Sequence, residues 1–201
     1  LLVSVSIMTM ILGITLSGGP TAIMRLSLSD NVYATELILR EAQLQGSAVS
    51  SLNDTFGGAG VIFDLASPTI VTKFRDRVDP AIPHAIGIGD GLYQTSPVSE
   101  FDSLKKITGN HKITNLCVTQ TVPPFVCNAA NTPSIDTLTI SFTRPKQGAN
   151  IYVNSSTAIN YSAACIQVDS LRAPAQGFVR SIIVYRSGMI LKKIGTCASV
   201  I

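Results

Sequence analysis

The chain has no tryptophan, two histidines and few aromatic side chains, and only 13% of its 201 residues are charged. The shortage of aromatic rings removes the usual platforms for stacking bases or sugars. Neither Gly-x-Ser-x-Gly nor His-Glu-x-x-His occurs, and acidic residues are scattered singly, so we expect no catalytic residue, no cofactor and no enzyme. Because there is also no Cys-x-x-Cys pair, we expect no metal site.

Cysteine is rare but even in number, and all four cysteines lie in the C-terminal half of the chain. In an exported domain such a count favours disulfides. Three pairings are possible. We favour Cys117–Cys127, which closes a short loop, and Cys165–Cys197, which ties a strand to the C-terminal end.

Charge is absent from residues 1–24, and Arg25 is the first charged residue. As a helix, its almost wholly apolar opening half, residues 1–16, nearly spans a hydrocarbon core, which needs about 20 residues. We therefore predict a transmembrane or filament-core helix over residues 1–24; a cleavable signal peptide and a plain single-pass anchor are the alternatives. The apolar residues of this helix are Leu1, Leu2, Val3, Val5, Ile7, Met8, Met10, Ile11, Leu12, Ile14 and Leu16.

An amphipathic pattern predicts that the helix continues over residues 25–46, with Glu36 and Arg40 as an i,i+4 pair and Gly46 as a stop. The apolar residues that recur near helical spacing are Ile23, Leu26, Val32, Tyr33, Leu37 and Ala42. A break is predicted inside the helix at residues 18–20, where Gly18 and Gly19 precede Pro20. Proline lacks the N–H that the helix needs and clashes with the preceding turn.

Residues 47–201 are predicted to form one globular domain of antiparallel strands. Short runs rich in β-branched residues are separated by Gly, Pro, Asn or Asp, and no helical crossover lies between them. The predicted strands cover residues 61–63, 69–71, 113–118, 138–142, 151–153, 165–168, 178–185 and 189–194. We expect a connector at residues 47–60, which ends in the glycine-rich residues 57–60, and a long loop, packed across the sheet, at residues 76–100. The predicted fold class is α+β: a long N-terminal α-helix followed by an antiparallel β-sheet domain.

Three segments carry a resemblance to a known family. Residues 1–8 (LLVSVSIM) resemble the segment of type IV pilins and pseudopilins that follows their Phe-Thr-Leu-Ile-Glu processing motif. Residues 39–43 (LREAQ) are similar to the helix end of the subgroup that includes the H-type pseudopilin and FimT-like minor pilins. The closing strand, glycine turn and strand around Gly188 resemble the same proteins. The family's leader, methylated first residue and assembly glutamate would lie just before Leu1.

The resemblance implies a structural subunit of a type IV pilus-like extracellular filament, with roles in adhesion, motility or DNA uptake. Such a subunit would be held in the cytoplasmic membrane and then polymerise with identical copies through its apolar helix, with the help of the pilus assembly machinery. The alternatives within the family are a minor pilin that binds DNA for uptake and a type II secretion pseudopilin.

Basic residues gather near the C-terminal end, and the resemblance suggests Arg180, Arg186, Lys192 and Lys193 as DNA contacts. The alternative is an ordinary solvated sheet face, and a net charge of +3 is too small to indicate a nucleic-acid partner.

Three triplets match the glycosylation sequon, at Asn53, Asn154 and Asn160. Such triplets arise often by chance. They are modified only in a host that has the enzyme.

Overall fold

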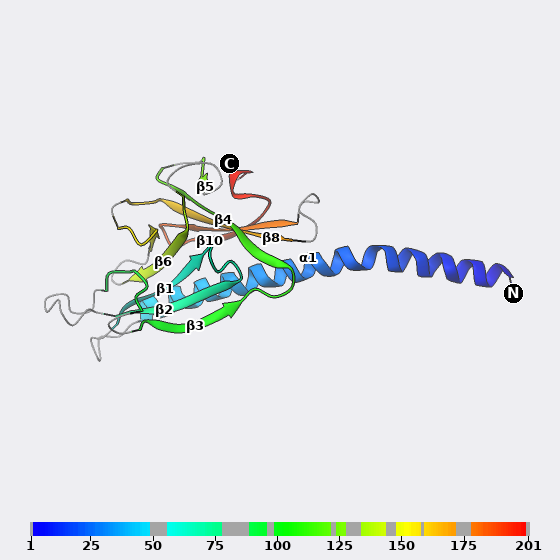
Figure 1. Ribbon diagram of the computed structural model, residues 1–201, viewed down its shortest axis with the longest axis horizontal. Coiled ribbons are helices and arrows are strands. Elements are labelled where there is room, and N and C mark those ends of the chain that lie inside the picture. The colour runs from blue at the N-terminus through cyan, green and yellow to red at the C-terminus, as the bar shows by residue number, and fades with distance from the viewer. Residues whose placement is uncertain are drawn as a thin grey trace.

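The computed structural model describes residues 2–48, 56–77, 89–95, 99–121, 124–127, 134–143, 148–157, 159–171 and 178–199. One long helix, α1 (Leu2–Ala48), begins the chain, and its N-terminal part extends away from a body built of strands (Figure 1). Within the described residues the body holds ten strands and a short 3-10 helix, η2 (Cys197–Ser199).

The strands form two antiparallel sheets of five strands each. The first sheet has the order β3-β2-β1-β6-β7 and the second has the order β10-β9-β8-β4-β5. The strands of the first sheet are β1 (Phe56–Asp64), β2 (Ile70–Arg77), β3 (Phe101–Lys106), β6 (Thr137–Thr143) and β7 (Ala149–Val153). Those of the second are β4 (His111–Thr119), β5 (Val126–Cys127), β8 (Ala163–Ser170), β9 (Val179–Tyr185) and β10 (Ile190–Ile194).

The C-terminal half of α1 packs against both sheets, contacting β1, β2 and β6 of the first and β8, β9 and β10 of the second. Leu28, Val32 and Leu39 of the helix are buried in one core with Ile140 of the first sheet and Ile182 of the second. Burying side chains of this size stabilises the fold by about 1.5–3 kcal/mol each. The helix and both sheets therefore share a single hydrophobic core.

The predicted α+β fold with one antiparallel sheet is wrong, because the chain is mostly β and has two sheets. Strand periodicity gives the position of a strand but not its partner. The burial pattern of the central strands accounts for the second sheet: in β6 and β8 both faces are buried over most of their length, which needs a cover on each side. The helix alone would cover only one face of one sheet.

The eight predicted strands all correspond to observed strands, and the sequence reading missed β3 and β5. The glycine-rich residues 57–60, predicted as a connector, lie inside β1. A Cβ at Gly60 would fall 2.5 Å from the ring of Phe74, so the glycines let neighbouring groups approach the strand. Of the predicted loop at residues 76–100, Asp76 and Arg77 instead belong to β2, whereas residues 89–95 pack against the first sheet, as expected.

Two predictions about α1 are also wrong. The helix is one element across residues 18–20, whose side chains lie outside the described part, because a proline inside a helix removes only one hydrogen bond and need not end it. Gly46 does not stop the helix, which continues to Ala48. A Cβ at Gly46 would overlap the carbonyl oxygen of Phe142, so this glycine allows α1 to approach β6 closely.

Candidate functional site

The feature that most needs a functional explanation is α1, which has apolar side chains on two opposite faces. Leu28, Val32, Leu39 and Ala42 are buried against the sheets. The sequence pattern groups Val32 and Ala42 on one apolar face with Leu37, which is exposed to solvent in the structure. The periodicity was therefore helical as predicted, but the apolar surface is divided between two faces.

The exposed face carries five large apolar side chains, which we call the α1 stripe. Their exposed fractions are 69% for Ile23, 65% for Leu26, 59% for Tyr33, 54% for Leu37 and 69% for Leu44. Successive members are separated by three, seven, four and seven residues, which is the spacing of a heptad seam. Exposed Asp30 and Arg40 occupy the remaining positions of that repeat. The α1 stripe is therefore a continuous face directed away from the β body.

The N-terminal part of α1 adds further exposed apolar side chains. Val3, Val5, Ile7 and Met8 are exposed by 73%, 55%, 55% and 70%. These residues belong to the predicted filament-core set. The side chains of its other members lie outside the described residues: Leu1, Leu2, Met10, Ile11, Leu12, Ile14 and Leu16. Within the described residues no helix is long and apolar enough to cross a membrane.

Polar contacts fix the docked face of α1 near its middle. The Nδ2 of Asn31 donates to the carbonyl oxygen of Thr108, and the Thr108 N–H donates to the Oδ1 of Asn31, both at 3.0 Å. One turn earlier, the Oγ of Ser27 lies 3.2 Å from the Nε2 of His111 at the start of β4. Burial lowers the pKa of His111, so the ring is neutral at pH 7.

Ion pairs fix α1 nearer its C-terminal end. The predicted pair of Glu36 and Arg40 forms at 2.8 Å, and Lys192 of β10 approaches the other carboxylate oxygen of Glu36 at 2.6 Å. Burial by itself would raise the pKa of Glu36, but hydrogen bonds from Lys192 and Arg40 outweigh it and hold the pKa below its ordinary value. Buried Lys73 of β2 is paired with Glu41 of the helix. Both sheets are therefore joined to α1 by charged contacts.

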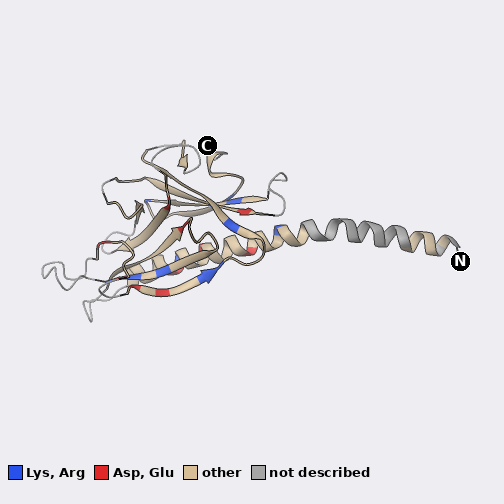
Figure 2. Cartoon of the chain, in the orientation of Figure 1, with Lys and Arg blue, Asp and Glu red and all other residues tan. Residues whose placement is uncertain are grey.

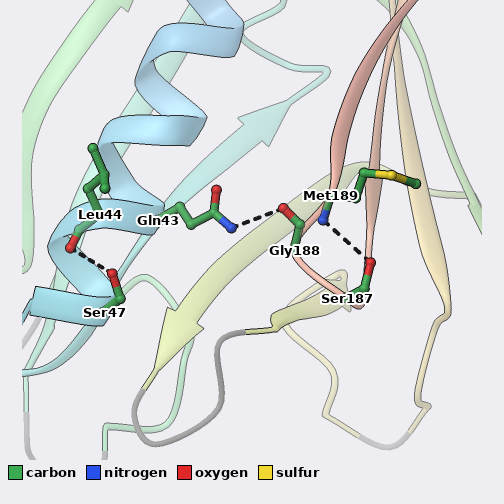
Figure 3. A pocket seen from close by; sticks show the side chains of 6 residues that line it. All are labelled: Gln43, Leu44, Ser47, Ser187, Gly188 and Met189. Atoms are coloured by element: carbon green, nitrogen blue, oxygen red, sulfur yellow. Dashed lines mark hydrogen bonds between the residues drawn. The ribbon is translucent and has the colours of Figure 1, made fainter.

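The last turn of α1 borders an open groove beside the turn between β9 and β10 (Figure 3). The Nε2 of Gln43 reaches across and donates to the carbonyl oxygen of Gly188 at 3.0 Å. Leu44 and Met189 lie on the two sides of the groove, and Met189 is 48% exposed. Because Leu44 is also the last member of the α1 stripe, the exposed apolar face of the helix runs directly into this groove.

Both predicted disulfides are present, Cys117–Cys127 and Cys165–Cys197. Cys117 and Cys127 face one another on β4 and β5, and Cys165 of β8 joins Cys197 of η2. The two bridges share a small buried cluster with Phe125 and other apolar residues of the second sheet. The cysteines therefore fix the short edge strand and the C-terminal end rather than form a reactive or metal-binding site.

The four basic residues predicted to contact DNA do not form a single patch. Lys192 and Lys193 are neighbours on β10, so their side chains point to opposite faces of the sheet, and Lys192 is engaged by Glu36. Arg180 and Lys192 share a face of the second sheet, because Arg180 pairs with Ile194 and Lys192 pairs with Ile182. Arg186 directly follows β9 and is six residues, about 20 Å of strand, from Arg180. Charges of both signs are scattered over the body (Figure 2). DNA binding by these residues stays a prediction.

The sequons differ in their surroundings. Asn53 lies outside the described residues. Asn154 is exposed, but its Nδ2 donates to the carbonyl oxygen of Ser134 at 2.7 Å and its Oδ1 accepts two backbone N–H groups, from Asp136 and Thr137. A glycan on that nitrogen would disturb this turn. Asn160 is exposed, so it is the more accessible of the two described sequons.

A buried carboxyl group that the sequence reading missed lies at Asp76. Its side chain is completely buried beneath residues 89–95. The sequence signal is one acidic residue among the charged residues that end β2, followed by a segment containing glycines, which is too common to identify such a site. No group of three or more His, Cys, Asp or Glu side chains in the described part of the chain is arranged to hold a metal ion.

Comparison of the chain with family models, curated proteins and solved structures finds no match.

Proposed function

We propose that the chain is a structural subunit of a type IV pilus-like extracellular filament and polymerises through α1 with identical copies. The observation that carries this proposal is the pair of apolar faces on α1. One face is buried in the subunit's own core, whereas the side chains of the α1 stripe are more than half exposed to solvent. A helix with both faces apolar belongs in an environment that surrounds it, such as other helices.

Energetics favour a protein cover for the α1 stripe. Five large apolar side chains, each more than half exposed, form a contiguous face larger than isolated exposed residues on a monomer would give. Covering such a side chain is worth about 1.5–3 kcal/mol when it passes from exposed to buried. The heptad spacing is that of helices that pack along their length. Another α1 helix offers the same spacing.

The polar positions of the α1 stripe suggest how two copies are aligned. Asp30 and Arg40 lie ten residues apart within the seam and have opposite charges. If parallel helices are offset by ten residues, about 15 Å along the axis, Asp30 of one copy lies beside Arg40 of the next. If the helices were in register, Asp30 would lie beside Asp30 and Arg40 beside Arg40, and like charges repel. A staggered arrangement of this type continues without closing and builds a fibre.

Before assembly the apolar residues 1–24 would hold the subunit in the cytoplasmic membrane, with the β body outside. Two disulfides suit a body that folds in an oxidising compartment. In the filament the same residues would exchange lipid for neighbouring helices. Because lipid and helices are similarly apolar, close packing and the pilus assembly machinery would drive this step.

The test replaces Leu26 and Leu37 with Asp in the full chain and measures self-association after detergent dilution, by sedimentation and electron microscopy. Both side chains are exposed, so the fold should survive, which circular dichroism and intact disulfides will verify. We expect the L26D/L37D variant to lose at least tenfold in assembled material. The matched control is Ser29→Asp, an exposed position beside the α1 stripe, which should assemble like the original chain. Undiminished assembly of L26D/L37D would contradict the proposal.

A further inference from the structure

Asp76 near the end of β2 is a completely buried acid beneath a glycine-containing segment, residues 89–95. One carboxyl oxygen, Oδ2, accepts the N–H of Gly91 at 2.9 Å. The other, Oδ1, is buried and has no hydrogen-bond partner among the described residues. The hydroxyl of Ser141 on β6 is likewise buried without a partner there. Two polar groups beneath the same segment are thus incompletely satisfied.

Residues 89–95 fit closely against the sheet. A side chain at Gly89 would overlap the Asp76 carboxyl group. At Gly91, which has a φ of +78°, a Cβ would lie 2.8 Å from the Oγ of Ser141 and 2.9 Å from the hydroxyl of Tyr152. The ring of Tyr93 packs on that of Phe74, with 5.6 Å between centroids. The segment therefore seals Asp76 from water.

The charges around Asp76 do not compensate a carboxylate there. Burial raises the pKa of Asp76 to about 7, the Gly91 N–H opposes that rise in part, and the negative charges of Glu100 and Asp90 add to it. From β7, Tyr152 stays neutral because burial and the charges of Asp76 and Asp90 raise its pKa. The charge of Arg77 acts on Glu100, whose carboxylate also accepts the Arg77 N–H.

We propose that Asp76 is a proton-controlled latch, which keeps residues 89–95 seated on the first sheet while its carboxyl group is neutral and releases them when the group is charged. A buried carboxylate with one unpartnered oxygen is costly, whereas a neutral carboxyl group is tolerated. Detachment of the segment lets water reach the carboxylate and uncovers the ring of Phe74. The latch does not depend on polymerisation.

The direction of the pH effect follows from the raised pKa. An exposed aspartate has lost its proton well below pH 7, so the opened segment binds fewer protons than the seated one between pH 4 and 7. Rising pH therefore favours opening throughout that window, and acid favours the seated form. From pH 5.5 to 8.5, the ionised fraction of a group with a pKa of about 7 rises from about 3% to about 97%.

The experiment uses the absence of tryptophan from the chain. Tyr93→Trp in the full chain places a single tryptophan over Phe74, and its emission is recorded from pH 5.5 to 8.5 together with hydrogen–deuterium exchange of residues 89–95, corrected for intrinsic rates. We expect a red shift that develops mainly below pH 7 and levels off above it, with a loss of at least tenfold in protection over the same range. Addition of Asp76→Asn, which cannot ionise, should remove both changes, whereas Asp136→Asn, at an exposed site just before β6, should leave them.

Either of two results overturns the latch: emission and exchange that do not change with pH, or the same pH dependence in the Y93W/D76N chain. If D76N does not fold, carbon NMR of the labelled aspartate carboxyl groups in the original chain decides instead. A midpoint near pH 4 for Asp76 contradicts the proposal, and one near pH 7 that coincides with a shift of the Gly91 amide supports it.

Discussion

The ammonium group of Lys192 lies 2.6 Å from a carboxylate oxygen of Glu36 and also sits 4.8 Å from the centre of the Tyr33 ring. One side chain of the second sheet thus joins a buried acid of α1 to a member of the exposed α1 stripe. The contact fixes the helix on the body and determines which of its faces is left outward. The same contact engages Lys192 with Glu36, although the sequence predicts Lys192 as a DNA contact.

Replacing Glu36 with Gln should destabilise the chain by about 1 kcal/mol at pH 7, since it removes the charge that pairs with Lys192 and Arg40. Because the folded pKa of Glu36 lies below its ordinary value, its contribution is present above pH 5 and is lost as the pH falls through the folded pKa. Urea unfolding from pH 3 to 7 should therefore show the two chains converging in acid.

The matched control for E36Q is Asp30→Asn on the exposed face of the same helix. It should leave the free energy of unfolding within about 0.5 kcal/mol of the original at every pH. A constant difference between E36Q and the original chain down to pH 3 would show that packing, rather than the ion pairs, explains the loss.

Replacing Gly46 with Ala should destabilise the chain although alanine favours helices. The gain in helix propensity is about 1 kcal/mol, whereas the new Cβ would overlap the carbonyl oxygen of Phe142 and force α1 away from β6. We expect a net loss of about 1–3 kcal/mol in chemical unfolding. Ser29→Ala, on the exposed side of α1, should change stability by less than about 0.5 kcal/mol. A stabilised G46A chain would mean that the helix does not approach β6 this closely.

The two disulfides should contribute unequally. Cys165–Cys197 joins residues 32 positions apart, and Cys117–Cys127 joins residues 10 apart. In the chain-entropy account the longer loop constrains the unfolded chain more, by about 1 kcal/mol. The paired Ala replacement of Cys165 and Cys197 should therefore lower the free energy of unfolding further than that of Cys117 and Cys127. The opposite order would show that native packing around β5 outweighs loop closure.

Local features of this chain could be predicted well from its sequence. The long helix, the Glu36–Arg40 pair and eight of the strands follow from periodicity and spacing. The cysteine count predicts disulfides, and the favoured one of three possible pairings is the one observed. The edge strands β3 and β5 were missed because one is exposed along almost its whole length and the other has two residues. Neither carries the alternation that marks a half-buried strand.

Long-range relationships could not be predicted. Periodicity does not show which strands pair, so the division into two sheets was hidden, and with it the burial of β6 and β8 on both faces. Periodicity also does not show which side of a helix contacts the sheets. The sequence pattern therefore groups Val32 and Leu37 on one face of α1, although in the structure Val32 is buried and Leu37 is exposed. The sequence predicts a loop packed across the sheet, but no local pattern indicates that this loop covers the side chain of Asp76.

The central claim is that the α1 stripe is covered by other copies of α1 in an assembled filament. The most direct measurement compares how fast a water-soluble maleimide labels Leu37→Cys in dispersed and assembled full chain, with Asn160→Cys on the β body as the reference. Leu37 is 54% exposed in the single chain, so dispersed L37C should react readily. We predict that assembly slows labelling of L37C at least tenfold more than that of N160C, and equal labelling before and after assembly would contradict the account.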